Sequence, residues 1–159
     1  MRILGLDPGL QRTGWGVIAK DGSRLAYVAS GVVASNKDAL LAARLAQLFA
    51  GINEVLAAYS PAHASIEETF VNANPRSALK LGHARGVALL APALAGVSVF
   101  EYTPNQIKKT IVGNGHADKA QVAAMVKILL GGKVEAKAGD ASDALAAAIC
   151  HAHQWRNPA

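Results

Sequence analysis

Four acidic residues occupy positions where carboxylates could bind a metal ion. Asp7 and Glu67 each follow an apolar run that is typical of a buried strand. Asp140 and Asp143 are three residues apart at the start of the last predicted helix, so their side chains share a face. Strand ends and a helix start can converge on one edge of a sheet, where four negative charges would repel each other without a cation. Oxygen ligands without paired Cys or His favour Mg²⁺ or Mn²⁺ over zinc.

Each acid also has a simpler interpretation. Asp7 precedes Pro and Gly, and its side chain could bond to the local backbone of a turn. Glu67 could be solvated at a strand end, and Asp140 and Asp143 could form an N-cap and its capping-box partner. Taken one at a time, these alternatives stay open. The metal site accounts for all four acids together.

Apolar periodicity and turn signals predict the elements that would position these acids. Strands are expected at residues 3–6, 14–19, 24–34, 62–66 and 97–102. Helices are expected at about 36–59, 76–95, 118–130 and 140–155, with a further short helix after Thr103-Pro104. Asn36 is expected to cap the first helix. The Asp21-Gly22 turn predicts that the first three strands form an antiparallel meander, and the later strands alternate with helices. We therefore predict an α/β fold, a five-stranded mixed sheet flanked by helices on both faces.

Composition narrows the class of protein. The 159 residues suit a single domain (1–159), and 52% apolar with 17% charged residues exclude a disordered chain. The formal net charge of +5 is compatible with a polyanionic partner. The lone Cys150, expected in the core, excludes an internal disulfide. We found neither a signal peptide nor 18–20 uninterrupted apolar residues, and predict a cytoplasmic protein with no membrane span.

Four blocks of sequence resemble the RuvC family of crossover-junction endodeoxyribonucleases, in order along nearly the whole chain. They are ILGLDPG with TGWG (3–9 and 13–16), Ile66-Glu67 with SALKLGHARGV (77–87), VGNGHADKAQV (112–122) and DASDALA (140–146). His83 and Glu68 stand where many members of the family carry Gln. Neither difference touches the four acids.

The resemblance implies a ribonuclease H-like fold and a homodimer that makes paired incisions in four-way (Holliday) DNA junctions during recombination and repair. It also implies two Mg²⁺ ions, for which Mn²⁺ could substitute, with Asp7 bridging them and Glu67, Asp140 and Asp143 completing their ligands. The products would carry 5′-phosphate and 3′-hydroxyl ends. The RuvA–RuvB branch-migration complex is the partner that membership in this family would suggest.

Basic residues beside the Gly-rich segment 113–116 are candidates for DNA contact. Lys108, Lys109 and Lys119 flank this segment, and the resemblance places Lys108 and Lys119 near the cleaved strand. Each lysine could equally be solvated on a helix surface. Arg76, Lys80 and Arg85 recur at spacings of four and five residues on one predicted helix, which fits a DNA-facing stripe and a solvated face equally.

Phe70 is a further candidate, because an aromatic side chain in a polar loop has no evident role in the core. It could stack on an unpaired base of the junction or simply anchor the loop. His116 is more simply a loop histidine than a phosphate contact. His151 and His153 are two residues apart, on different sides of a helix, which disfavours a shared metal ion.

Three other functions are compatible with parts of the sequence. An actin-like ATPase or sugar kinase also has a strand ending in Asp-x-Gly, but it needs two domains and an adenosine motif, for which this chain is too short. A junction-binding module without catalysis would be expected to lack one of the four acids. A related nuclease acting on RNA would differ mainly in its substrate surface. For the homodimer that the resemblance implies, the apolar surface of the helix predicted at 76–95 is the candidate interface.

Overall fold

The computed structural model describes residues 1–68, 74–135 and 139–156. Within these ranges the elements are β1 (Arg2–Asp7), β2 (Arg12–Asp21), β3 (Arg24–Ala34), α1 (Leu41–Tyr59), β4 (His63–Glu67), α2 (Pro75–Leu94), β5 (Ser98–Tyr102), α3 (Pro104–Val112), α4 (Lys119–Leu129) and α5 (Asp140–Gln154). This order of strands and helices confirms the order that the sequence predicts.

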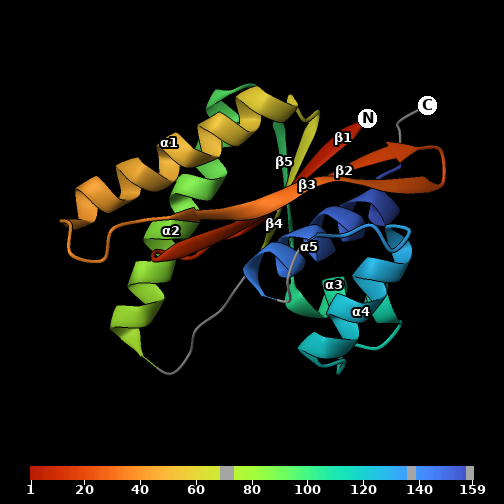
Figure 1. Cartoon of the computed structure of the whole chain (residues 1–159). Helices are drawn as coiled ribbons and strands as arrows, with labels where there is room; N and C mark the ends of the chain where they lie inside the picture. The colour runs from red at the N-terminus through yellow and green to blue at the C-terminus, as the bar shows by residue number, and fades with distance from the viewer. Residues whose placement is uncertain (69–73, 136–138, 157–159) are drawn as a thin grey trace.

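The five strands form one mixed sheet in the order β3-β2-β1-β4-β5 (Figure 1). Strand β2 is antiparallel to both β1 and β3, so the predicted meander is confirmed. Strands β1, β4 and β5 are parallel to one another. The carboxyl ends of β1 and β4 therefore lie at the same edge of the sheet, which is where Asp7 and Glu67 stand.

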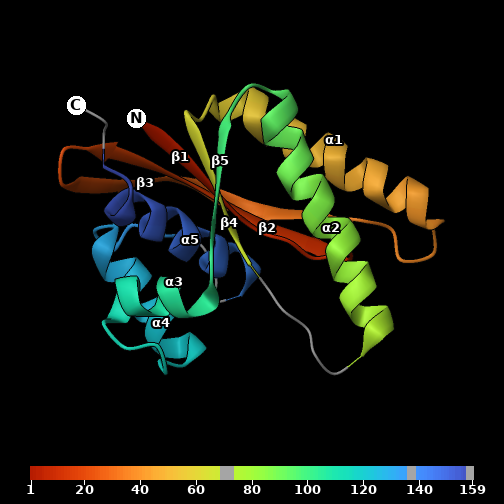
Figure 2. The same cartoon turned by 180° about the vertical axis from the view of Figure 1, so that it is seen from behind.

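Helices cover both faces of the sheet, as predicted. Helices α1 and α2 lie on one face, and α5 lies on the other with α3 and α4 packed outside it (Figures 1 and 2). Leu4, Leu6 and Ile66 belong to the core beneath α1 and α2, whereas Ile3 belongs to the core beneath α5. Since side chains alternate along a strand, Asp7 points to the same side as Ile3, toward α5.

Glycines let α5 lie directly on the sheet. A Cβ atom on Gly5 would stand 1.8 Å from the backbone oxygen of Ala144, and one on Gly14 would stand 2.1 Å from that of Asp140. Gly14 pairs with Asp7 across the β1–β2 ladder. Close approach at these two positions brings the first turn of α5 next to the end of β1.

The start of α1 differs from the prediction. The helix begins at Leu41 with Leu40 at the N-cap, which makes no side-chain cap bond, so the expectation that Asn36 caps it is wrong. The Asn36 side chain instead accepts a hydrogen bond from the backbone N–H of Asp38 at 3.0 Å. Asn favours such a local turn over a helix, and the N-cap therefore lies four residues later, at Leu40.

Among the described residues, α1 alone has the length and hydropathy to cross a membrane. Its mean hydropathy over the relevant window is 1.2. Leu48, Ile52 and Leu56 of this helix are buried in the core. The apolar face of α1 therefore packs against the sheet.

Candidate active site

A pocket of about 220 Å³ opens where the carboxyl ends of β1 and β4 meet the start of α5. Three of the four candidate acids, Asp7, Glu67 and Asp143, line it. Two candidate lysines, Lys108 of α3 and Lys119 of α4, line it as well. The apolar part of the wall is formed by Pro104, Ile107, Val122 and Ala146. The pocket thus combines negative and positive groups in a partly apolar setting.

The acids in this pocket destabilise one another's charged form. Burial raises the pKa of Asp7 to about 7, and the negative charges of Glu67, Asp143 and Asp140 add to the effect, while Lys119 opposes it. Burial and then Asp143 also raise the pKa of Glu67, opposed by Lys119 and Lys108. A carboxyl group with a pKa near 7 in a pocket is a candidate functional group.

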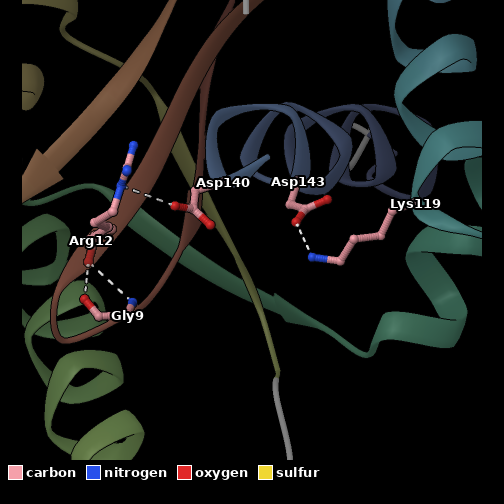
Figure 3. A network of polar contacts seen from close by, with 6 residues as sticks. Gly9, Arg12, Lys119, Asp140 and Asp143 are labelled. Carbon is pink, nitrogen blue, oxygen red and sulfur yellow. Dashed lines mark hydrogen bonds and ion pairs between the residues drawn. The ribbon is translucent and has the colours of Figure 1, made fainter. Parts of the chain in front are cut away.

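Basic side chains bind the two acids of α5 (Figure 3). The Nζ of Lys119 donates a hydrogen bond to Oδ2 of Asp143 at 3.1 Å, which raises the pKa of Lys119. The Nε of Arg12 lies 3.6 Å from Oδ2 of Asp140. Arg12 stands at the start of β2, and the turn after β1 brings it back to the edge that carries Asp7. Arg12 is not among the residues that the sequence predicts for the site, because its pairing with Asp140 joins segments that are far apart in the chain.

Asp140 and Asp143 are each paired with a basic side chain in this structure. In the part of the chain that the structure describes, no three His, Cys, Asp or Glu side chains are grouped closely enough to bind one metal ion as they stand. Asp140 is also absent from the residues that line the pocket, because its carboxylate is turned to Arg12. A metal ion held by all four acids would require Asp140 and Asp143 to leave their basic partners.

The alternative role of Asp140 and Asp143 as helix caps is not what the structure shows. Gly139 is the N-cap of α5, with φ of 135°, and residues 139–156 include no side-chain cap bond at this end. Asp140 is the first helical residue, and the backbone N–H of Asp143 donates to the oxygen of Gly139. Both carboxylates are therefore free of a capping role and lie in the first turn, where the helix dipole favours negative charge.

Arg76, Lys80 and Lys109, which are also candidates for DNA contact, do not line this pocket. Arg76 and Lys80 line a second pocket, of about 330 Å³, between the starts of α1 and α2. Lys109 is exposed on α3 and does not line the acid pocket. Arg85 pairs with Glu101 of β5, so it does not continue the stripe begun by Arg76 and Lys80. Phe70 lies outside the described residues.

Cys150 and the histidines considered from the sequence do not line the acid pocket. Cys150 is buried in the core, as predicted, and burial raises the pKa of its thiol. His153 is exposed, whereas His151 is fully buried, which agrees with the prediction that they do not share a metal ion. His116 is exposed in the loop before α4.

The strand order, the mixed sheet and the acids at the ends of β1, β4 and the start of α5 define a ribonuclease H-like protein. Within this class, residues 3–151 match the model of the family described as crossover junction endodeoxyribonuclease RuvC. The chain belongs to the RuvC family.

Individual relatives agree with this assignment. RuvC of Beijerinckia indica is 59% identical over 159 residues, covering 100% of this chain and 90% of the relative. The structure of Thermus thermophilus RuvC in complex with Holliday junction substrate is 36% identical with a TM-score of 0.88, covering 96% of this chain and 93% of that one. The yeast mitochondrial Holliday junction resolvase Ydc2 is 12% identical with a TM-score of 0.65, covering 94% and 78%, and shares the fold.

Proposed function

We propose that this protein resolves four-way DNA junctions by hydrolysing one phosphodiester in each of two symmetry-related strands, with divalent metal ions bound by Asp7, Glu67, Asp140 and Asp143. The observation that carries the proposal is the pocket in which Asp7, with a pKa near 7, lies among other carboxylates and beside Lys108 and Lys119. Such a pocket in a chain of the RuvC family is suited to an anionic substrate and a cationic cofactor.

The chemistry of the donor set fits Mg²⁺, with Mn²⁺ as a substitute. All four side chains offer carboxylate oxygens, which hard divalent cations prefer. Burial, and then the neighbouring carboxylates, raise the pKa values of Asp7 and Glu67, and a bound cation would stabilise their charged forms. When bound, two ions would activate water and stabilise the charge on the leaving 3′ oxygen.

The chain's own residues bind and orient the DNA. Lys119, once released from Asp143, and Lys108 provide positive charge for the phosphate at the mouth of the pocket. Pro104, Ile107 and Val122 limit the access of water from the α3–α4 side. Lys109, Arg76, Lys80 and Phe70 remain candidates for contacts with the DNA arms. Cleavage on the 3′-oxygen side gives 5′-phosphate and 3′-hydroxyl ends.

A homodimer acting in the cytoplasm, with RuvA–RuvB as its branch-migration partner, completes the proposal. Two-fold symmetry of the enzyme matches the paired strands of an open four-way junction. Leu79, Leu90 and Leu94 of α2 are 62%, 51% and 69% exposed. Their spacing of eleven and four residues puts them on one face of the helix, which supplies an apolar surface for a second copy. RuvA–RuvB is inferred from membership in the family.

Cleavage assays on three substrates test the proposed function. We expect incision of a synthetic four-way DNA junction with Mg²⁺, and far slower cleavage of a linear duplex of the same sequence and of structured RNA. EDTA should abolish the reaction, and Asp143→Asn should remove most of it. Preferential cleavage of RNA, or ATP hydrolysis without DNA cleavage, would contradict the proposal.

A further inference from the structure

Strand β4 presents three polar side chains to α5. His63, Ser65 and Glu67 alternate along the strand and so point to the same face of the sheet. The intervening Ala64 and Ile66 are fully buried, and Ile66 packs in the core beneath α1 and α2. The α5 side of β4 is therefore polar along its whole length.

Helix α5 presents a matching row. Asp143, Ala147 and His151 are spaced by four residues, so they lie on one face of the helix. The helix runs from the edge that carries Glu67 toward the start of β4. Four helical residues advance about 6.0 Å and two strand residues advance about 6.6–6.8 Å, so the two rows remain nearly in step.

Direct hydrogen bonds join the two rows. The Ser65 hydroxyl donates to the backbone oxygen of Ala147 at 2.8 Å. Nδ1 of His63 and Nε2 of His151 are 2.9 Å apart. At the third position, Glu67 and Asp143 line the same pocket, and each charge opposes the other. We call the contacts Ser65–Ala147 and His63–His151 the β4–α5 polar register.

The His151 side chain has a second hydrogen-bond partner, on β5. Its Nδ1 is 2.8 Å from the hydroxyl of Tyr102, which pairs with Glu67 across the β4–β5 ladder. Phe100 and Trp155 surround the ring, with centroids 4.4 and 6.2 Å away. Both ring nitrogens of this fully buried side chain thus have partners, as a buried polar group requires.

Small residues make up much of the surface by which α5 packs on the sheet, and they constrain its axial position less than the buried Leu145 and Ile149 do. The residues that α5 buries include Ala144, Ala146, Ala147, Ala148 and Ala152. Small side chains make a smooth surface, and glycines on the sheet face them. Directional hydrogen bonds distinguish one axial position from another, because a shift of one residue breaks them.

We propose that His63, Ser65 and His151 are positioning residues that fix the axial register of α5 on β4, and thereby set the separation of the Glu67 and Asp143 carboxylates for metal binding. This inference rests on the proposed function, since it takes these two acids as metal ligands. None of the three residues lines the acid pocket. They act through the helix that carries Asp143.

Metal affinity measured without DNA tests the inference. Mn²⁺ binding is followed by the electron paramagnetic resonance of the free ion, in the parent and in the variants His151→Phe and Ser65→Ala. We expect each variant to raise the Mn²⁺ dissociation constant about three- to tenfold, a lower effect than that of groups bonded directly to ligands. The Mg²⁺ concentration that half-saturates junction cleavage should rise by the same factor, while cleavage at saturating Mg²⁺ returns close to the parent rate.

Matched variants separate register from general stability. Ile149→Val removes a buried methyl group from the same helix and should lower the melting temperature while leaving the Mn²⁺ dissociation constant within about 1.5-fold. His151→Gln retains an amide that can donate to His63, and should recover part of the affinity. Tyr102→Phe removes only the hydroxyl next to His151, so it should lower the Mn²⁺ affinity less than His151→Phe does. It replaces His151→Phe in the comparison if that variant does not fold.

The outcomes are distinguishable. The inference is wrong if His151→Phe and Ser65→Ala bind Mn²⁺ as tightly as Ile149→Val does, because the register then has no positioning role. Where one of these variants does not fold, the same comparison is made with Tyr102→Phe. Asp143→Asn is the reference for the site itself. If Asp143→Asn binds Mn²⁺ as tightly as the parent, the proposed metal site is wrong, whatever the behaviour of the His151 variants.

Discussion

Asp7 is a carboxyl group whose ionisation the folded state opposes. Its pKa is raised from 3.8 to about 7, chiefly by burial and then by Glu67 and Asp143. Between those two pH values the folded protein binds more protons than the unfolded chain, so the free energy of unfolding falls as pH rises through this range. Above pH 7 the free energy of unfolding falls no further through Asp7, and its total decrease is at most about 4 kcal/mol. A destabilising carboxylate of this kind agrees with the metal-ligand role proposed for Asp7.

Asp7→Asn should therefore stabilise the metal-free protein. In EDTA at pH 8 we expect a melting temperature several degrees above that of the parent, because about 1 kcal/mol corresponds to roughly 2–4 °C in a protein of this size. The difference should shrink at pH 5, where Asp7 is already protonated in the folded state. Asp21→Asn, in the exposed β2–β3 turn, is the control and should change little. Equal melting temperatures of Asp7→Asn and the parent at pH 8 would contradict the pKa argument.

The same residues separate binding from chemistry. Asp7→Asn and Asp143→Asn should each slow cleavage at least about a hundredfold, since ions that stabilise the transition state act on the rate. In EDTA at low salt each variant should bind the junction as tightly as the parent or slightly more tightly, because one repulsive charge is gone. Added salt should reduce that gain.

Gel-shift titration and single-turnover cleavage on the same preparations measure both effects. Asp21→Asn again provides the control for a lost charge away from the pocket. A folded Asp143→Asn protein that cleaves within about threefold of the parent would show that Asp143 is no metal ligand.

At the scale of elements, α5 connects the acids to the sheet. It carries Asp140 and Asp143, and it rests on Gly5 and Gly14 with backbone atoms in close approach. A methyl group at Gly14 has no room, because the oxygen it would meet belongs to the backbone of Asp140. The first turn of α5 must therefore shift if Gly14 is replaced.

Gly14→Ala should lower both stability and activity. We expect a loss of about 1–3 kcal/mol from overpacking and at least a tenfold slower cleavage, because Asp140 moves relative to Asp7. Gly22→Ala is the matched control: its φ of +56° makes alanine cost roughly 1–2 kcal/mol, with no atom within 4 Å to displace. This control should lose stability and still cleave like the parent. Parent-like cleavage by Gly14→Ala would mean that α5 tolerates the shift.

Local sequence patterns predict most of the strands and helices. They do not predict which side chains from distant parts of the chain form ion pairs. Apolar periodicity locates the strands and helices, and the position of Asp7 and Glu67 after buried runs places them at one edge. Asn36 misled the prediction because a cap and a local turn use the same side-chain oxygen. The Arg12–Asp140 and Lys119–Asp143 pairs join distant segments, and no spacing in the sequence reveals them. The β4–α5 polar register could be predicted only in part. Its residues are two apart on the strand and four apart on the helix, but this spacing has a meaning only once the two elements are known to pack together.

At the scale of the whole molecule, the two faces of the sheet have different surroundings. The α5 face carries the acid pocket and is covered by α3 and α4 (Figure 2). The opposite face is covered by α1 and α2, where Leu90 and Leu94 stay exposed. A second copy docked on α2 would leave both acid pockets open to DNA, as paired incision of one junction requires.

A positive charge introduced by substitution on the exposed face of α2 should dissociate the dimer. We expect the parent to sediment as a dimer at micromolar concentration, with and without DNA, and Leu90→Lys to sediment mainly as a monomer, because each dimer would bury two lysines. Ile128→Lys is the control, since Ile128 is 69% exposed on α4, on the other side of the sheet, and should leave the dimer intact. The Leu90→Lys monomer should also nick a junction in one strand more often than it makes paired incisions. A parent protein that sediments as a monomer in both conditions would overturn the dimer, and a dimeric Leu90→Lys would move the interface away from α2.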